Sequence, residues 1–243
     1  MNNIRISTII VIICIFIIGL YAMGEVNYFA SKIVAEGNID APTVLIPSVG
    51  IQEKINEESL SQGVLHDPDS YNPTEGDVIL FGHRTLQGSP FLRLNDVKVG
   101  DSIVLEWPGI GEETYTVKDI VVVPASSNLD ASEGGNTLYL VTCDPIGSSA
   151  NRLIIQAELS NTGPLNNQIV SENPQASYAF YIATAFLVLG LVFSLIYPKD
   201  NRIYIFMAVL VMSAILFYFC INPIPSDVIY SKISFLNGEG IWM

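Results

Sequence analysis

The sequence predicts a mainly β protein, a closed β-barrel joined to one N-terminal and two C-terminal transmembrane helices. Two observations predict this fold class. Short strand-like segments, separated by turns rich in Gly and Pro, follow one another over residues 43–160. Three long apolar runs lie outside that region, in a chain that is 50% hydrophobic. The strands are too many and the helical segments too short for alternating β and α units, so we expect a barrel.

The three apolar runs are each long enough to cross a bilayer as a helix, which takes roughly 17–25 residues. They cover residues 6–23, 178–197 and 203–221. The first run could instead belong to a cleaved signal peptide, because residues 22–24 resemble a cleavage site. It is longer than the apolar part of most signal peptides, which favours a retained anchor.

The cations beside these runs predict the orientation of the chain. Arg5 precedes the first run, and Lys199 and Arg202 lie in the short turn between the other two. Cytoplasmic loops are enriched in Lys and Arg, so all three residues are expected in the cytoplasm and the central domain outside, in a multi-pass cell-membrane protein. The predicted parts are an N-terminal transmembrane anchor (1–24), a juxtamembrane connector (25–42), a catalytic β-barrel (43–160), a linker (161–177), a two-span transmembrane hairpin (178–221) and an extracytoplasmic tail (222–243).

Within the barrel region, apolar alternation and turn residues locate the elements. The longest alternating run lies near the middle of the region, and the most apolar one ends at Cys143. In chain order, the sequence predicts strands at 44–46, 49–51, 77–81, 102–106, 114–123, 137–142 and 153–155, helical turns at 56–62 and 90–94, and loops at 63–76 and 125–136.

The outward domain is strongly acidic, which excludes one class of partner. Residues 25–175 carry seven Lys or Arg and 21 Asp or Glu, a net charge of −14, whereas the whole chain carries −13. A nucleic-acid backbone needs a basic surface, so no nucleic-acid partner is expected.

Cysteine placement singles out one thiol. Cys14 and Cys220 fall inside apolar runs, where a small apolar role is expected. Cys143 is the one cysteine in the outward domain. Disulfides are common outside the cytoplasm, so a cysteine without a partner there is either a buried core thiol or a reactive group.

Three residues with complementary chemistry lie at predicted strand ends. The strand 137–142 ends at Cys143, the strand 77–81 is followed by His83, and Arg152 begins a further apolar strand. A thiolate is a nucleophile, and a histidine exchanges protons with the thiol and a leaving amine. A guanidinium stays charged and stabilises an oxyanion. We therefore expect the three groups to converge at one mouth of the barrel and to perform acyl transfer.

At these residues the chain resembles the sortases, which are membrane-anchored cysteine transpeptidases of prokaryotic cell surfaces. The resemblance covers residues 43–159, in order and at compatible spacing. The matching segments are TLYLVTC at 137–143, VILFGHR at 78–84, RLIIQA at 152–157, IPSVGI at 46–51, GSPF at 88–91 and VGDSI at 99–103.

The resemblance implies an eight-stranded sortase barrel and catalytic roles for His83, Cys143 and Arg152. It also implies cleavage of an LPxTG-like sorting signal through a thioester on the cysteine, and transfer of the acyl group to an amine. Thr142 is expected to offer its hydroxyl or backbone to a substrate carbonyl. His66, where the family often has a histidine, is expected either to contact substrate or to support a wall of the site.

The resemblance also suggests partners and a subclass. The expected partners are secreted proteins with a C-terminal sorting signal, an amine acceptor on the cell envelope, and the membrane. Residues 25–42 contain no lid motif of the Asp-Pro-aromatic type, which favours the housekeeping-like or class D/E branches over pilin-polymerising ones. The C-terminal hairpin departs from the usual family pattern of one or two spans.

No cofactor or metal is expected. Asp130 and Glu133 are fewer carboxylates than a Ca²⁺ site usually needs, and His66 and His83 have no third ligand at a suitable spacing. Two functional alternatives remain open from the sequence. One is a membrane-bound cysteine protease in which water resolves the thioester, and the other is a catalytically inactive barrel that acts as a scaffold.

Overall fold

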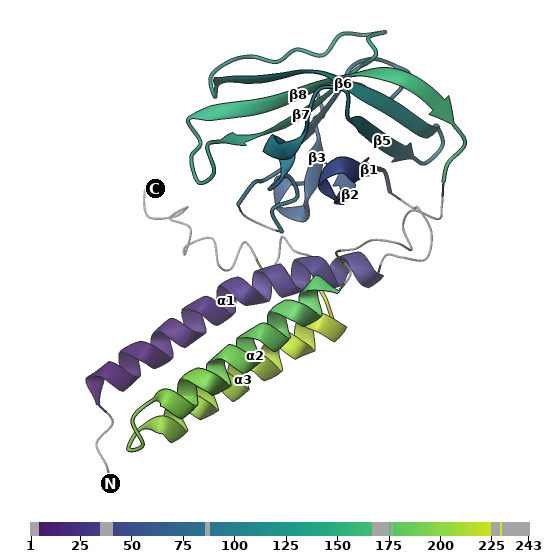
Figure 1. Cartoon of the computed structure of the whole chain (residues 1–243). Coiled ribbons are helices and arrows are strands. Elements are labelled where there is room, and N and C mark those ends of the chain that lie inside the picture. Colours follow the sequence, from purple (N-terminus) through teal and green to yellow (C-terminus); the bar gives the residue numbers. More distant parts are fainter. Residues whose placement is uncertain are drawn as a thin grey trace. The chain divides into compact units, whose positions relative to one another are not determined.

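The computed structural model describes residues 5–34, 41–85, 88–166, 175, 177–224 and 229. Most of the predicted tail, and parts of the predicted connector and linker, lie outside the described residues. The chain forms two compact units, one made of residues 36–174 and the other of residues 1–35 and 175–243. Figure 1 shows strands in the first unit and three long helices in the second.

Within the described residues, eight strands close into a barrel in the order β1-β2-β3-β4-β7-β8-β6-β5 (Figure 1). This confirms the predicted fold class. The strands are β1 (Thr43–Ile46), β2 (Ile51–Asn56), β3 (Val64–His66), β4 (Val78–Phe81), β5 (Ser102–Trp107), β6 (Gly111–Pro124), β7 (Thr137–Asp144) and β8 (Asn151–Gly163). Three short 3-10 turns, η1 (Pro47–Val49), η2 (Leu60–Gln62) and η3 (Leu94–Asp96), connect some of them.

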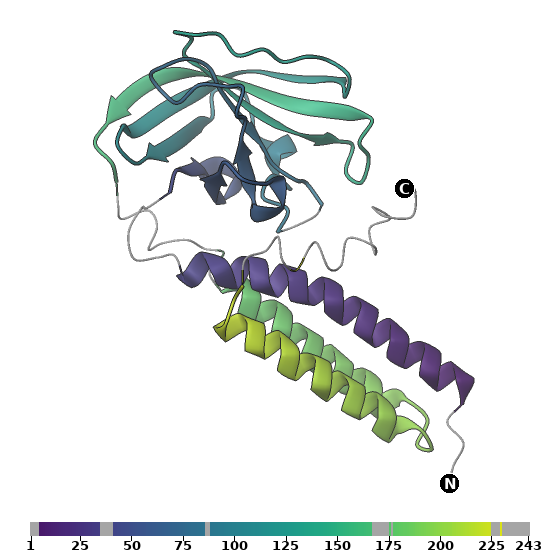
Figure 2. The ribbon, with the colours of Figure 1, turned by 180° about the vertical axis from the view of Figure 1, so that it is seen from behind.

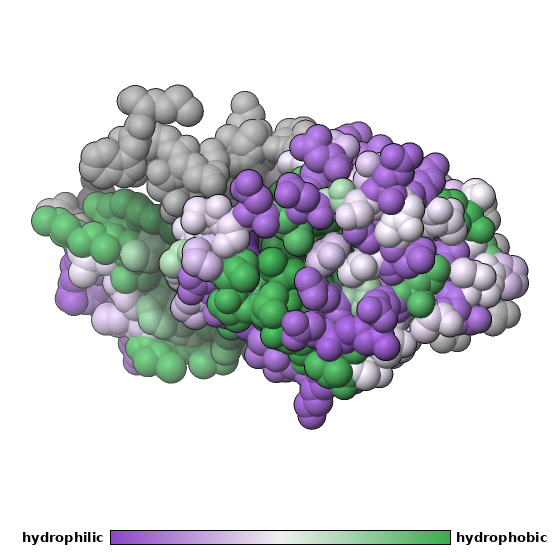
Figure 3. All heavy atoms as spheres, turned by 90° about the horizontal axis from the view of Figure 1, so that it is seen from above, coloured by the Kyte–Doolittle hydropathy of each residue, from purple (hydrophilic) through white to green (hydrophobic). Residues whose placement is uncertain are grey.

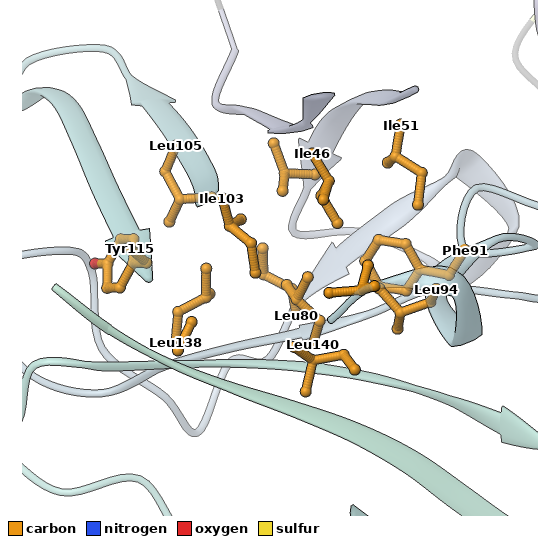
Figure 4. Packing of buried hydrophobic residues seen from close by; sticks show 14 of the residues in the cluster. Ile46, Ile51, Leu80, Phe91, Leu94, Ile103, Leu105, Tyr115, Leu138 and Leu140 are labelled. Carbon is orange, nitrogen blue, oxygen red and sulfur yellow. The ribbon is translucent and has the colours of Figure 1, made fainter. Parts of the chain in front are cut away.

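Alternate strand residues fill the barrel interior, because successive side chains of a strand point to opposite faces. Figure 4 shows the interior side chains converging, with Tyr115 and Leu138 of the strands on one side and Phe91 and Leu94 of the β4–β5 connection on the other. Full burial of such a side chain contributes roughly 1.5–3 kcal/mol. The interior cluster therefore fixes the strands whose ends carry the predicted site residues.

A second apolar cluster covers the outer face of β4, β7 and β8. Ile79, Val141 and Ile154 are buried there, and Leu129 and Ala131 of the β6–β7 loop pack over them. Each of the three strand residues is next in sequence to a residue of the interior cluster, so the two clusters lie on opposite faces of the same strands. The loop thus becomes a wall over the outer face.

The strand directions define two ends of the barrel. β4 and β7 are parallel, and β8 is antiparallel to β7. The C-terminal ends of β4 and β7 and the start of β8 therefore share one end. By the same pairings, β1 begins and β8 finishes at the opposite end.

Among the residues that the structure describes, three helices are long and apolar enough to cross a membrane, as predicted. They are α1 (Ile6–Val34), α2 (Tyr178–Ile196) and α3 (Arg202–Ile221), and their candidate spans have mean hydropathies of 2.8, 2.4 and 2.5. Figures 1 and 2 show the three helices side by side. Many of their apolar side chains are exposed, among them Leu189 at 68% and Ile196 at 79%. The face of the barrel seen in Figure 3 is instead mostly hydrophilic around a smaller apolar group.

Polar contacts at both ends tie the helices together. Arg5 forms an ion pair of 3.2 Å with Asp200, and the hydroxyls of Thr8 and Tyr197 lie 3.1 Å apart. Near the other end, the Asn27 side chain donates to the carbonyl of Ile224 at 2.8 Å and accepts from its amide at 2.9 Å. Small residues allow close packing between these ends, since a Cβ on Gly190 would meet Val209 Cγ1 at 2.5 Å.

Candidate active site

Cys143 is the next-to-last residue of β7 and lies directly opposite Arg152 of β8. The Arg152 guanidinium reaches across this pair, with Nη1 3.6 Å from the Cys143 Sγ atom. The same nitrogen lies within hydrogen-bonding distance of the carbonyls of Ser149, at 3.1 Å, and Asn151, at 3.2 Å. Backbone acceptors at the start of β8 therefore hold the cation beside the sulfur, which is half-buried and reachable.

The backbone register brings His83 level with Cys143. Phe81 of β4 pairs with Val141 of β7 in a parallel ladder. Two residues beyond Phe81, past the end of β4, the chain reaches His83, and two residues beyond Val141, still within β7, it reaches Cys143. Both residues therefore lie at the same end of the barrel, after neighbouring parallel segments.

Two hydrogen bonds lock the segment between the strand and the histidine onto β7. The Gly82 amide donates to the Val141 carbonyl at 3.1 Å. The hydroxyl of Thr142, which is buried, donates to the Gly82 carbonyl at 2.7 Å. His83 is then anchored on its other side, because its carbonyl accepts from the Phe91 amide at 3.0 Å. In this structure the Thr142 hydroxyl joins the two strands, and its contact with a substrate stays a prediction.

His66 lies in the barrel interior. It is the last residue of β3 and pairs with Leu80, whose side chain belongs to the interior cluster. Its Nε2 lies 3.1 Å from the Tyr71 carbonyl and 3.1 Å from the Ser70 hydroxyl, and its ring meets the Trp107 ring edge-on at 5.2 Å. These are the contacts of a residue that supports the β3–β4 loop. Substrate contact by His66 stays a prediction.

An ion pair joins the residue after the histidine to the residue after the cysteine. Arg84, which is 5% exposed, donates from Nη1 to Asp144 Oδ1 at 2.8 Å and to the Cys143 carbonyl at 3.4 Å. The sequence did not identify Asp144 as a partner of Arg84. A charge directly after each reactive residue was the only available signal.

A pocket of about 300 Å³ opens on the outer face beside Arg152. Its floor is apolar and comes from β4, β7 and β8, with Phe81, Val141 and Ile154. Its wall is the β6–β7 loop, including Leu129 and Asp130. Because Arg152 lines this pocket and also contacts Sγ, an extended segment bound there would lie next to the thiol. Among the described residues, no group of three or more His, Cys, Asp or Glu side chains is placed to hold a metal ion.

This fold and site define a cysteine transpeptidase of the sortase type. The family model for the sortase domain matches residues 39–160, half of the chain, and the chain belongs to the sortase family. The family assignment confirms the resemblance seen in the sequence.

Solved structures with similar folds include three sortases. A lid mutant of sortase A from Corynebacterium diphtheriae is 26% identical, with a TM-score of 0.46, and the match covers 52% of this chain and 73% of that one. Sortase C-1 from Actinomyces oris is 29% identical, with a TM-score of 0.46 and coverage of 51% of this chain and 75% of that one. A Clostridium perfringens sortase D5 transpeptidase is 23% identical, with a TM-score of 0.45 and coverage of 50% of this chain and 79% of that one. The subclass stays a prediction. A search of curated proteins finds no match.

Proposed function

We propose that the protein is a sortase that cleaves an LPxTG-like sorting signal and transfers the acyl part to an amine acceptor at the cell surface. The observation that carries this proposal is the position of Arg152 Nη1, 3.6 Å from the Cys143 sulfur, at the barrel end where β4 leads into His83.

The chemistry follows from these three groups. The Cys143 thiolate attacks the scissile carbonyl carbon, and Arg152 donates hydrogen bonds to the oxygen on which negative charge develops. The C–N bond then breaks, His83 gives a proton to the leaving amine, and a thioester remains. An incoming amine attacks the thioester, gives a proton to His83 and expels the thiolate, so the enzyme returns to its starting state.

The pocket beside the thiol suits an extended peptide that begins with apolar residues. Its floor of Phe81, Val141 and Ile154 offers apolar contacts to the Leu and Pro of such a signal, and Leu129 closes the side. Arg152 lines this pocket and its Nη1 lies 3.6 Å from the sulfur, so we expect a scissile carbonyl of a peptide bound there to lie next to the thiol. We take residues 43–160 as the catalytic domain on this basis.

We further propose that the catalytic domain lies outside the membrane, with α1 and the α2–α3 hairpin as the anchor. Three apolar helices support this arrangement, and the cations near their ends support its direction. Cleavage of a peptide added outside intact cells, which it cannot enter, would support this orientation. Cleavage that appears only after lysis would contradict it.

The proposed reaction is tested with the full chain in detergent, an LPxTG peptide and an amine such as triglycine. We expect a thioester adduct on Cys143 and a ligated peptide, both visible by intact-mass spectrometry. Cys143→Ala should abolish both products. Cys220→Ala, which removes a thiol of α3, is the matched control and should retain them.

The other outcomes separate the alternatives. A hydrolysed peptide without any ligated product, at saturating amine, would identify a cysteine protease. No adduct with any sorting-signal peptide, together with slow alkylation of Cys143, would identify an inactive scaffold.

A further inference from the structure

Asp77 connects the start of β4 to the loop that forms the pocket wall. It precedes β4 directly and is 5% exposed. Its carboxylate accepts two backbone hydrogen bonds, from the Ser132 amide to Oδ2 at 3.1 Å and from the Thr137 amide to Oδ1 at 2.9 Å. Its own amide donates to the Ser132 carbonyl at 3.0 Å. One residue thus makes three hydrogen bonds, two to Ser132 of the β6–β7 loop and one to Thr137 at the start of β7.

The backbone next to Asp77 adds to this attachment. The Gly134 amide donates to the Glu75 carbonyl at 2.8 Å, and Gly76 forms an isolated β-bridge with Glu133. The approach is close enough to exclude side chains, since a Cβ on Gly135 would overlap the Asp77 carboxyl group. We call this set of contacts, between residues 75–77 and 132–137, the loop clasp.

The loop clasp lies at the base of both strands that carry the proposed catalytic residues. Asp77 precedes β4, which leads to His83, and Thr137 begins β7, which leads to Cys143. The strands are paired in parallel, so the carboxylate bridges their N-terminal ends while the reactive groups lie beyond their C-terminal ends. The Asp77 side chain is therefore a strand length away from the bond-making atoms.

The clasped segment is continuous with the pocket wall. Leu129 and Asp130 line the pocket, and Ser132 follows two residues after Asp130. Leu129 and Ala131 pack on the outer apolar cluster, so a shift at Ser132 would be carried into the wall. The wall is thus held by apolar packing at the pocket and by the Asp77 carboxylate at its base.

We propose that Asp77 is a positioning residue that sets the affinity for the acyl-donor peptide by holding the β6–β7 loop as the wall of its pocket. The inference rests on the proposed function, because the pocket is taken as the peptide site. A carboxylate suits this role because both of its oxygens face amide donors. An asparagine would keep the shape, but its NH₂ group would face one of the two amides.

The test compares kcat and KM for the sorting-signal peptide in the full chain, for wild type, Asp77→Asn and the control Asp69→Asn. Asp69 is an exposed carboxylate in the same β3–β4 loop. We expect Asp77→Asn to raise KM about tenfold and to change kcat less than threefold, since uniform binding is lost and bond making is not. Asp69→Asn should match wild type.

Two further measurements keep the inference testable if Asp77→Asn folds poorly. Gly135→Ala keeps the aspartate at position 77 but adds a methyl group that would overlap its carboxyl group from the loop side. This variant should therefore also raise KM. Amide exchange at Ser132 and Thr137 should accelerate in both variants, while alkylation of Cys143 by a small reagent keeps its wild-type rate.

The results that would overturn the inference differ from those that would overturn the function. If the wild type is active and the folded variants have an unchanged KM, or lose only kcat, the positioning role of Asp77 is wrong. The transpeptidase proposal then stays intact. A wild-type chain that neither cleaves nor ligates any sorting-signal peptide removes both.

Discussion

The Arg152 side chain, proposed to stabilise the oxyanion, is held in place by its surroundings. Its Nη1 atom is shared between the Cys143 sulfur and two backbone carbonyls at the start of β8. The guanidinium is planar and presents several donors in a fixed arrangement, whereas an ammonium is a compact charge on a flexible stem. The geometry of the charge, as well as its sign, should matter for the reaction.

Arg152→Lys is therefore expected to lower kcat/KM for the acyl donor by about 10²-fold, as the loss of one oxyanion donor does. Arg93→Lys is the matched control, because Arg93 is an exposed arginine of the same domain that pairs with Asp96. Steady-state kinetics with a fluorogenic sorting peptide would measure both. A value for Arg152→Lys within threefold of wild type would show that charge alone suffices.

At the residue scale, the sequence predicted the candidate site residues that lie in local patterns. Cys143, His83 and Arg152 were recognisable because each lies at the boundary of an apolar strand and in a family-like motif. Asp77 and Asp144 were not predicted, because their partners lie 55 to 60 residues away in sequence. The strand register that brings such pairs together is set by the closed barrel and leaves no local pattern.

At the element scale, the predicted strands match the structure best where apolar alternation is long. The strand predicted at 114–123 lies within β6 (Gly111–Pro124), and the one predicted at 137–142 lies within β7. β3 was missed, since its three residues fall in a segment predicted as a loop and are too few to show a period. The helical turn predicted at 56–62 is reduced to η2 (Leu60–Gln62), because β2 extends to Asn56.

Two neighbouring strands also carry a titratable pair. Glu106 of β5 lies opposite Glu112 of β6, is fully buried, and accepts a hydrogen bond from the Asn166 amide at 2.9 Å. Burial, with a contribution from Glu112, raises the pKa of Glu106 to about 7 from its ordinary value of 4.5. Burial also raises the pKa of Glu113. The folded barrel thus binds protons on these groups more tightly than the unfolded chain does.

Because these pKa values are raised in the folded state, the contribution of the two groups to stability falls as the pH rises. The stabilisation from protonated Glu106 is complete below pH 4.5 and is lost as the pH rises through about 7. The slope from one such group is at most about 1.4 kcal/mol per pH unit. Glu106→Gln stays neutral at both pH values, so the free energy of unfolding of the variant minus that of wild type should increase from pH 5 to pH 8. Denaturant titrations at both pH values would measure this, and a constant difference would contradict it.

At the scale of the whole molecule, composition alone predicted three membrane helices around one outward domain. The structure adds that β1 begins and β8 ends at the barrel end opposite Cys143. The proposed active site therefore lies a strand length away from the first and last residues of the barrel's strands. Hydropathy could not predict this, since it depends on strand directions that only the pairing defines.

The central claim is that position 83, just beyond the end of β4, lies beside position 143 of β7, and a cross-link measures it most directly. In a full chain with Cys14→Ala and Cys220→Ala, oxidation of the His83→Cys variant should give an intramolecular disulfide to Cys143, because parallel neighbours fall within the Cα separation that a disulfide spans. Arg93→Cys in the same background is the control and should give none. Peptide mapping that finds free thiols at both positions of the His83→Cys variant would contradict the account.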